Sequence, residues 1–241
     1  MYFKPKDIKI GILGGGQLAK MIHQESMSLD ISIHFMDDSL VCPVAKVSPN
    51  FTLGNIQNFD DVYNFGKDKE IVSIEIENVN IEALKALESI GIQVYPKPEV
   101  LEMIQDKGLQ KEFLIQNNFP TSPYTFCSSI VELKESILQG KLKYPFVQKL
   151  RKGGYDGRGV CIVKSESELF KLLDGESIIE ELALIEQEIS VIAVRSIHGE
   201  CKTYPSVSMV FHSVANLVEY LICPSNISIE KEAIAQKIAM E

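Results

Sequence analysis

The amino-acid sequence predicts an α/β protein, with a parallel, doubly wound sheet over roughly the first hundred residues and a mixed α+β region after it. Strand-like and helix-like patterns alternate as far as Pro98, which is typical of parallel strands joined by right-handed crossovers. From Glu99 the pattern changes to short helices, a glycine-rich loop between two strands, and a series of short strands. These observations together predict the fold class.

Runs of β-branched and apolar residues predict four strands in the first part. The first run, 8–13, ends at a triple glycine, and Leu18, Met21 and Ile22 then recur at helical spacing. A second helix carries Ile81, Leu84 and Leu87 between the last two strands. The three further strands are expected at 31–36, 71–76 and 92–95.

The second part opens with helices. One or two short helices are expected over 99–117, and another over 130–138 after a turn-rich stretch. Ser165, followed three residues later by Glu168, has the spacing of a capping box. This pair predicts a helix over 166–173.

Strands dominate the rest of the chain. Strands 145–150 and 160–163 flank the glycine-rich loop and predict a hairpin. Four more strands predict an antiparallel meander, and a last helix begins near Ser228. An amphipathic helix normally covers a sheet, so we expect the chain to be a truncated form of a protein whose sheet continues. The meander strands are expected at 178–182, 188–196, 204–211 and 218–223, and the apolar helix face at Ile229, Ala233 and Ile234.

Composition narrows the class of protein. The 241 residues include 24 Lys and Arg against 33 Asp and Glu, a formal net charge of −9, which argues against nucleic-acid or anionic-membrane partners. Apolar stretches fall short of the ~18–20 residues that span a membrane, and the N-terminus lacks the features of a signal peptide. The 5 cysteines have no CxxC spacing, so neither a disulfide framework nor a zinc site is predicted. We expect a soluble, cytoplasmic protein.

The triple glycine fits a phosphate-binding turn. Gly14, Gly16 and Ala19 match the Gly/Ala variant of the dinucleotide fingerprint, and Asp37 stands where an acid for a ribose hydroxyl is expected. Glycines let the backbone approach a phosphate, and helix N-terminal amides stabilise the anion. Binding of NAD, binding of another phosphate ligand, and a simple tight turn all remain open at this point.

The second glycine-rich segment, 153–159, is more specific. Lys149, Arg151, Lys152 and Arg158 surround its glycines. Cations beside residues of minimal bulk suit a flap that closes over a polyphosphate. The alternative is an exposed hairpin, but such a hairpin does not require so many glycines.

Two groups of carboxylates are further candidates. Glu180 and Glu181 follow an apolar strand, where backbone groups can bind an adenine edge and Glu188 can accept from a ribose; two solvated carboxylates are the alternative. Glu75 and Glu77 are expected on one face at the carboxyl end of a strand, where open α/β sheets bind ligands. The histidines share no ligand spacing, so no metal ligand is predicted, and the residues alone identify no catalytic group.

Taken together, these segments resemble the ATP-grasp ligases, and among them the 5-(carboxyamino)imidazole ribonucleotide synthases of purine biosynthesis. The resemblance spans nearly the whole chain, and GGYDGRG is its most specific part. The matching segments are GILGGGQLAKM (11–21), EIENV (75–79), QDKGLQKEFL (105–114), PFVQKLRKGGYDGRGV (145–160) and IIEELALIEQEISVIAVR (178–195).

The resemblance implies a Rossmann-like, preATP-grasp domain over 1–98 and an incomplete α+β ATP-grasp domain over 99–241. The latter would contain a small lid at about 120–182 and the start of a large subdomain up to 241. The implied reaction uses ATP and bicarbonate to carboxylate the amine of 5-aminoimidazole ribonucleotide, through carboxyphosphate. The resemblance also implies Mg²⁺ as a cofactor and a homodimer.

The same resemblance implies roles for individual residues. Lys107 and Lys149 would contact ATP phosphates. Residues 154–160 would form the flap, residues 180–183 would hold adenine, and Glu188 would hold the ribose. The implied ATP-binding residues after the lysines are Gly154, Tyr155, Asp156, Gly157, Arg158, Gly159, Val160, Glu180, Glu181, Leu182, Ala183, Glu188 and Phe211. Those implied for the ribonucleotide are Gly15, Gly16, Gln17, Leu18, Glu75 and Asn78.

Several positions depart from the family pattern. Ala19-Lys20 replaces a frequent Gly-Arg, Lys107 replaces Arg, and Ser208 replaces Glu after a strand. No segment resembles the family's metal-binding Asn-Glu, so we expect the chain as it stands not to turn over ATP at a useful rate. The alternatives are another ATP-grasp purine enzyme, of the formate-dependent glycinamide ribonucleotide transformylase type, and a non-catalytic nucleotide-binding protein. A dehydrogenase ranks last because it leaves the second part unexplained.

Overall fold

The computed structural model describes residues 8–154, 159–212 and 218–241. Its contacts divide the chain into two compact units, Met1–Asp106 and Lys107–Glu241. Helix α4 (Pro98–Gln105) belongs to the first unit because it packs on α3 and because its Leu101 is buried in that unit's core. The division between the units therefore follows α4, whereas the boundary expected from the sequence precedes it.

The first unit contains a parallel five-stranded sheet with the strand order β3-β2-β1-β4-β5. The central strand is β1 (Ile10–Leu13), in which Ile10 lies beside Ile33 on one side and Ile71 on the other. The sheet confirms the four strands predicted from the sequence. The other strands are β2 (Ile33–Asp37), β3 (Phe51–Leu53), β4 (Ile71–Ile74) and β5 (Gln93–Tyr95).

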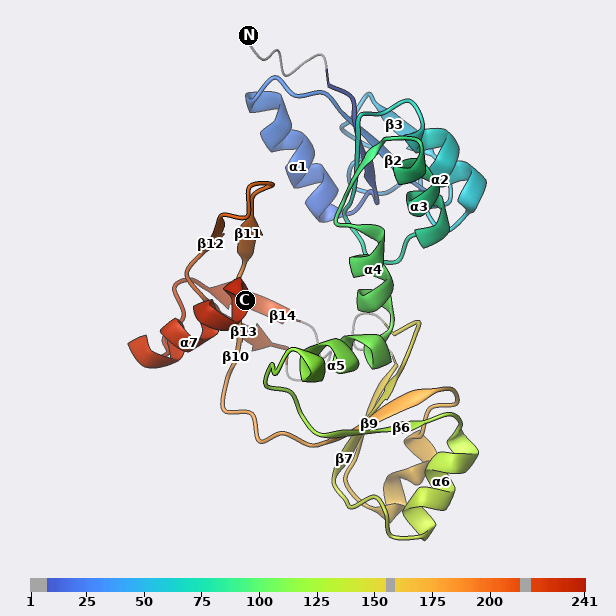
Figure 1. Cartoon of the computed structure of the whole chain (residues 1–241), viewed down its shortest axis with the longest axis vertical. Coiled ribbons are helices and arrows are strands. Elements are labelled where there is room, and N and C mark those ends of the chain that lie inside the picture. The colour runs from blue at the N-terminus through green and yellow to red at the C-terminus, as the bar shows by residue number, and fades with distance from the viewer. Residues whose placement is uncertain (1–7, 155–158, 213–217) are drawn as a thin grey trace. The chain divides into compact units, whose positions relative to one another are not determined.

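Both faces of this sheet are covered by helices, as the doubly wound pattern predicts. Successive residues of a strand point to opposite faces, and Ile12 and Leu13 accordingly belong to two different apolar clusters. Helix α1 (Gln17–Ser28) covers one face, whereas α2 (Phe59–Gly66) and α3 (Ile81–Ser89) cover the other (Figure 1).

The sequence patterns missed β3 and α2. Strand β3 has only three residues, and α2 has eight, too few to establish a clear period. Asn58 nevertheless caps α2 by accepting from the Asp61 N–H over 3.0 Å, and Asn80 caps α3 in the same way. The asparagine caps were the local signals available for these two helices.

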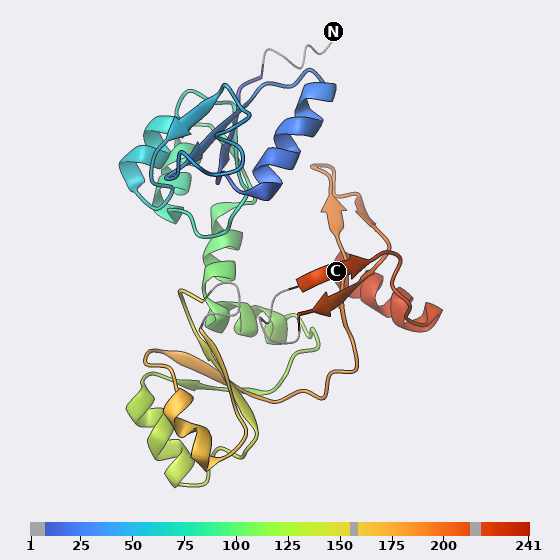
Figure 2. The ribbon, with the colours of Figure 1, turned by 180° about the vertical axis from the view of Figure 1, so that it is seen from behind.

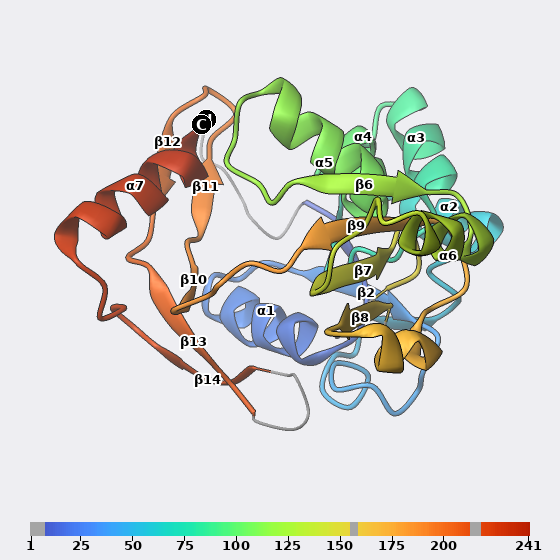
Figure 3. The ribbon, with the colours of Figure 1, turned by 90° about the horizontal axis from the view of Figure 1, so that it is seen from below.

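The second unit begins with α5 (Lys107–Gln116), which together with α4 confirms the predicted pair of short helices. A four-stranded antiparallel sheet follows, with the order β6-β9-β7-β8 (Figure 3). The predicted hairpin around the second glycine-rich loop is confirmed as β7 and β8, whereas β6 was missed. The strands are β6 (Tyr124–Cys127), β7 (Phe146–Leu150), β8 (Val160–Val163) and β9 (Ser177–Glu181).

One face of this second sheet is covered by α6 (Ile130–Leu138) and by a 3-10 helix, Glu166–Lys171 (Figure 2). The α-helix predicted over 166–173 is therefore wrong in type, and the predicted capping box does not form. Ser165 Oγ instead bonds to Ser167 Oγ, and Glu168 accepts from the Lys164 N–H over 2.8 Å. In a capping box Glu168 would accept from the Ser165 N–H, but here it accepts from the N–H of the preceding residue, Lys164.

The later strands are antiparallel, and the predicted meander is confirmed in part, because strands within the expected ranges 188–196, 204–211 and 218–223 pair in that order. Its expected first strand, at 178–182, is wrong as a meander strand, because β9 pairs with β6 and β7 in the other sheet. A three-stranded sheet has the order β10-β13-β14, and β11 pairs only with β12 in a separate hairpin. The expected strand at 188–196 is divided in two, which removes its second half from the sheet. The strands are β10 (Glu188–Ser190), β11 (Ala193–Arg195), β12 (Cys201–Thr203), β13 (Val207–Phe211) and β14 (Val218–Ile222).

The last helix, α7 (Ile229–Met240), starts where the sequence predicted it, because Ser228 caps it by accepting from the Lys231 N–H. Its expected apolar face is not buried: Ile229 is 89% exposed and Ile234 60% exposed. Helix α7 is instead attached through polar contacts. Glu232 accepts a hydrogen bond from the Ser206 N–H over 3.0 Å and another from the Ser206 hydroxyl.

Leu87→Ala is expected to lower the free energy of unfolding of the first unit by about 2–5 kcal/mol, because Leu87 is fully buried in its core. Urea unfolding followed by far-UV circular dichroism measures this change. Leu138→Ala is the matched control: Leu138 is 84% exposed, and its substitution is expected to cost less than about 0.5 kcal/mol. Equal losses in both variants would contradict the assignment of this core.

Candidate functional site

The glycine-rich turn between β1 and α1 is held by two carboxylates. The Gly15 N–H donates to Asp37 Oδ2 over 2.8 Å, and the Gly16 N–H donates to Glu75 Oε2 over 3.3 Å. Asp37 ends β2 and Glu75 directly follows β4, the strands that flank β1. The carboxyl ends of three neighbouring strands therefore meet at this turn, where open α/β sheets bind their ligands.

Side chains crowd the two glycines that donate to these carboxylates, so a larger residue at either position would displace a neighbour. A Cβ atom on Gly15 would lie 2.5 Å from Cys42 Sγ, and one on Gly16 would lie 2.5 Å from Glu75 Oε1. The sequence analysis explained these glycines by close approach to a phosphate. The structure gives a second reason for glycine at these positions, because the protein's own side chains already occupy the space beside them.

The first turn of α1 presents amides in the same place. Gln17 and Leu18 are exposed, and the first hydrogen bond of the helix runs from the Lys20 N–H to the Gly16 carbonyl over 3.2 Å. The N–H groups before that bond have no intrahelical acceptor, and the helix dipole favours an anion beside them. An anionic group can therefore be held by Gln17 and Leu18, whereas the Gly15 and Gly16 N–H groups are already used.

The structure changes the roles of the acidic residues around this turn. Asp37 bonds to Gly15 and, over 2.9 Å, to the Ser39 N–H, so it is not presented to a ribose as a dinucleotide fingerprint requires. The prediction that Glu75 and Glu77 share a face of a strand is wrong, because β4 ends at Ile74. Glu75 turns inward, while Glu77 and Asn78 are exposed.

A second cluster is centred on Glu180 in β9. Its carboxylate is only 6% exposed and lies between two lysines: Lys111 Nζ is 2.8 Å from Oε1, and Lys149 Nζ is 2.6 Å from Oε2. Lys111 comes from α5 and Lys149 from β7, so the carboxylate joins three elements. The adenine contact predicted for the segment that contains Glu180 involves backbone groups, and the Glu180 side chain is engaged by these two cations.

The electrostatics of Glu180 follow from these contacts. Burial alone would raise the pKa of Glu180, but the contacts with Lys111 and Lys149 outweigh burial, and the pKa lies below its ordinary value. Glu180 is therefore a carboxylate at neutral pH. Both lysines are held close to a negative charge inside the unit.

Lys111, Lys149 and Glu180 line a cavity of about 370 Å³, together with Lys107 and Gln110. Sequence analysis identified Lys107 and Lys149 but missed Lys111. The available signal was spacing: Lys107 and Lys111 are four residues apart on α5, which places them on the same helix face. The cavity is basic and can accept an anionic group.

The second glycine-rich loop, predicted to be a flap, lies between β7 and β8, the two strands of the hairpin that contains Lys149. Gly159 has φ +78°, and a Cβ atom there would lie 3.0 Å from the Gly154 Cα, so the two ends of the loop approach each other closely. The Leu150 N–H donates to the Gly159 carbonyl over 2.8 Å. Val160 begins β8 and is exposed. The predicted flap residues Tyr155, Asp156, Gly157 and Arg158 lie outside the described residues.

The remaining candidates for nucleotide contact lie farther along the chain. Glu181 ends β9, and its N–H donates to the Pro123 carbonyl over 3.3 Å; Leu182 and Ala183 follow the strand. Glu188 is exposed on β10, opposite Met209 of β13. Phe211 ends β13 and is half-buried. No contact among the described residues joins Glu188 or Phe211 to the lysine cluster, and their roles remain predictions.

Ser208, which departs from the family pattern, is buried in β13. Its hydroxyl accepts from the Gln187 side-chain amide over 2.6 Å and donates to Asn226 Oδ1 over 3.2 Å. Gln187 also donates to Asn226 over 2.8 Å. A neutral hydrogen-bonded network therefore surrounds the position at which the family typically has a carboxylate.

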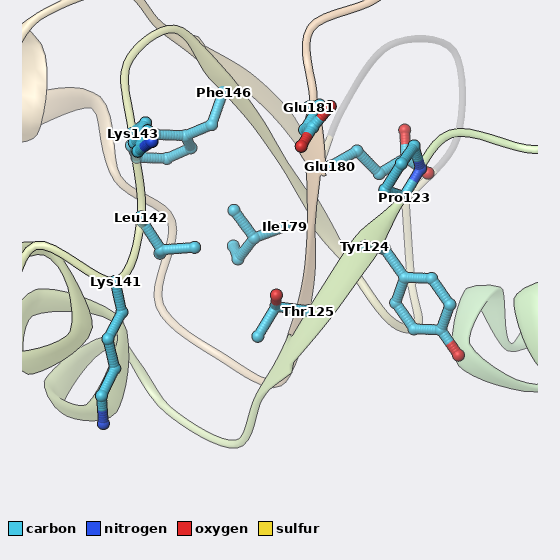
Figure 4. A pocket seen from close by; sticks show the side chains of 10 residues that line it. All are labelled: Pro123, Tyr124, Thr125, Lys141, Leu142, Lys143, Phe146, Ile179, Glu180 and Glu181. Carbon is cyan, nitrogen blue, oxygen red and sulfur yellow. The ribbon is translucent and has the colours of Figure 1, made fainter.

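Figure 4 shows a second cavity, of about 280 Å³, beside β9. It is lined by Leu142, Phe146 and Ile179, whereas the lysine cavity is lined by Ile178. Because neighbouring strand residues point to opposite faces, the two cavities use opposite faces of β9, with Glu180 at the edge of both. The second cavity has a mixed lining, in which Lys141, Lys143 and Glu181 accompany the apolar side chains, and it contains none of the phosphate-binding candidates.

Across the three described ranges, no group of three or more His, Cys, Asp or Glu side chains lies close enough to hold a metal ion. A search of the same residues for membrane spans finds no helix with both the length and the apolar character that a bilayer crossing needs.

Comparison with protein families agrees with this two-unit organisation. Residues 8–105 match the preATP-grasp domain of ribonucleotide synthetases, and residues 112–241 match the ATP-grasp domain. The chain belongs to the ATP-grasp family. The predicted fold class, a Rossmann-like preATP-grasp domain followed by an ATP-grasp domain, is confirmed.

Individual relatives give the resemblance more detail. Phosphoribosylaminoimidazole carboxylase of Candida glabrata is 34% identical over 211 residues, which are 83% of this chain and 36% of that protein. N5-carboxyaminoimidazole ribonucleotide synthetase from Thermotoga maritima matches with a TM-score of 0.82 at 31% identity, over 97% of this chain and 60% of that one.

A third relative carries ligands. N5-carboxyaminoimidazole synthase from Aspergillus clavatus, in complex with ADP and 5-aminoimidazole ribonucleotide, matches with a TM-score of 0.84 at 26% identity, over 97% of this chain and 61% of that one. Across the three relatives, the chain covers between 36% and 61% of their lengths.

Glu180→Gln is expected to lower the free energy of unfolding at neutral pH by about 3–5 kcal/mol, because it leaves two lysines without their shared carboxylate. The folded-state pKa of Glu180 lies below its unfolded value, so the stabilisation is present above the unfolded value and is lost as pH falls through the folded one. The difference between wild type and variant should therefore shrink in acid.

Urea unfolding at a series of pH values down to about 3 measures this difference. Glu181→Gln is the matched control, since Glu181 is the next residue of β9 and is exposed. It should change stability by less than about 0.5 kcal/mol at every pH. A loss for Glu180→Gln that stayed constant with pH would contradict an ionised carboxylate at this position.

Proposed function

We propose that this chain serves the ATP-dependent carboxylation of 5-aminoimidazole ribonucleotide by bicarbonate, the reaction of a 5-(carboxyamino)imidazole ribonucleotide synthase. The observation that carries the proposal is the basic cavity of the second unit, which three lysines and one buried carboxylate line beside a glycine-rich hairpin. Membership of the ATP-grasp family, and a relative that binds ADP with the ribonucleotide, support it.

The nucleotide would bind in the second unit. Lys107 and Lys149 would neutralise the phosphates, and the loop 154–160 would close over them. Exclusion of water by such a flap strengthens each ion pair between lysine and phosphate. Residues 180–183 would provide backbone contacts to adenine. Glu188 and Phe211 complete the proposed set by their resemblance to family positions, with the ribose hydroxyls as the partner of Glu188.

The ribonucleotide would bind at the turn of the first unit. Its phosphate would accept hydrogen bonds from the Gln17 and Leu18 amides at the start of α1, since Gly15 and Gly16 use theirs on the protein's own carboxylates. Glu75 and Asn78 would hold the rest of the ligand. Asp37 and Glu75 keep the turn in the conformation that directs those helix amides outward.

In this reaction the protein would mainly position the substrates and neutralise their charge. Phosphoryl transfer from ATP to bicarbonate develops charge on oxygen atoms, and Lys149 and Lys107 would stabilise that charge. Bicarbonate as co-substrate, Mg²⁺ bound with the nucleotide, a homodimeric assembly and a cytoplasmic location belong to the same proposal and rest on the resemblance. Mg²⁺ would supply charge neutralisation of the phosphates, and no step is assigned to it in this chain.

Lys149→Ala is expected to weaken ATP binding by about 1.5–3 kcal/mol, because a phosphate loses a charged hydrogen-bond donor. Isothermal titration calorimetry measures the affinity. Lys134→Ala is the matched control, because Lys134 is exposed on α6 and does not line the lysine cavity. Equal affinities of wild type and Lys149→Ala would remove Lys149 from the nucleotide site.

Glu75→Ala is expected to weaken the binding of 5-aminoimidazole ribonucleotide by about tenfold or more, because it removes both a ligand contact and the acceptor of the Gly16 N–H. Glu77→Ala, two residues away and exposed, is the control and should bind normally. If both variants bound the ribonucleotide as tightly as wild type, the proposed substrate site at this turn would be wrong.

A further inference from the structure

Lys111 is a buried cation to which the proposed function gives no role. Its side chain is 11% exposed, compared with 31% for Lys149, the other partner of Glu180. Lys111 Nζ donates to Thr121 Oγ1 over 2.5 Å and to the Ser122 carbonyl over 3.1 Å, in addition to its ion pair with Glu180. The ammonium group is thus held from several sides.

Lys149 is bound less completely. Among the residues that the structure describes, its ion-pair partner is Glu180 Oε2 at 2.6 Å, and 31% of its side chain is exposed. The two lysines therefore divide the Glu180 carboxylate between them, one oxygen each. Lys111 is fixed by the surrounding backbone and hydroxyl groups, whereas Lys149 extends from the strand that leads into the glycine-rich flap.

The charge of the cavity depends on this division. Among the described residues that line it, Lys107, Lys111 and Lys149 carry positive charge and Glu180 carries negative charge, an excess of two positive charges. Without Lys111, Glu180 and Lys149 would form a neutral pair, and the excess would fall to one. A neutral pair of Glu180 and Lys149 would attract a phosphate far less than Lys149 does when Lys111 compensates the charge of Glu180.

We propose that Lys111 is a positioning residue for nucleotide binding: it compensates Glu180, so that the charge of Lys149 stays available to a phosphate group of the ligand. The inference rests on the proposed function, since it concerns the same nucleotide site. A buried lysine that only ties α5 to β9 would stabilise the unit but would not discriminate between ligands with and without phosphate.

The experiment uses the full chain and two variants, Lys111→Met and the double variant Lys111→Met/Glu180→Gln. The double variant removes one positive and one negative charge together, so the cavity keeps the excess charge of the wild type. Calorimetric titrations with ADP and with adenosine measure the affinity of each protein. Circular dichroism and thermal unfolding show whether each variant is folded.

Lys111→Met is expected to weaken ADP binding by about tenfold or more and to leave adenosine binding within about twofold of wild type, because adenosine has no phosphate. The double variant is expected to bind ADP within about threefold of wild type. Because Lys111→Met also leaves Glu180 uncompensated, the affinities are compared for protein that circular dichroism shows to be folded. Unchanged adenosine affinity then separates a lost phosphate contact from loss of structure.

Three outcomes would overturn the inference. They are unchanged ADP affinity in Lys111→Met, an equal loss for ADP and adenosine, and a double variant that binds ADP no better than Lys111→Met. If Lys111→Met does not fold, the double variant decides, and ADP binding more than about tenfold weaker than wild type overturns the inference. Failure of the wild-type chain to bind ADP would instead overturn the proposed function, and the inference with it.

Discussion

A carboxylate that is buried away from water needs a nearby positive charge. The second unit is organised around one buried carboxylate, that of Glu180, whose charge two lysines compensate. Glu180 lies on the central part of a four-stranded sheet, and the cations that compensate it come from α5 and from β7. Removing either partner leaves an uncompensated charge in a medium of low dielectric constant. The resulting loss of folding free energy is far larger than that caused by losing a surface ion pair. The same contacts that hold α5 on the sheet therefore also arrange the cavity beside the flap.

The first unit uses the opposite arrangement, in which backbone donors are compensated by side-chain carboxylates. Asp37 and Glu75 accept from the Gly15 and Gly16 amides and close the turn before α1. In a dinucleotide fingerprint such amides approach the ligand, whereas here the first amides without an intrahelical acceptor begin one residue later, at Gln17. The two units thus contain the two environments that we propose for anions, one made of helix amides and one of lysines.

Much of the fold could be predicted from local patterns. The alternation of strands and helices before Pro98 was sufficient for the parallel sheet, and the glycine-rich hairpin was recognisable from its two flanking strands. Short elements were not, because three residues of β3 contain no period to detect. The pairing of β9 with β6 and β7, rather than with β10 as the predicted meander requires, depends on contacts between distant segments, which no local pattern contains.

For the site, the sequence by itself determined the residue types: the glycines at both turns, the cations around 149–158 and the acidic pair at 180–181. Only the tertiary structure decided which of them meet. It directed Glu75 inward and left Glu77 exposed, and it brought Lys111 from α5 to Glu180, sixty-nine residues away. Side-chain partners of this kind are set by packing across elements, and the electrostatic cost of burying Glu180 is what makes the pairing with Lys111 and Lys149 specific.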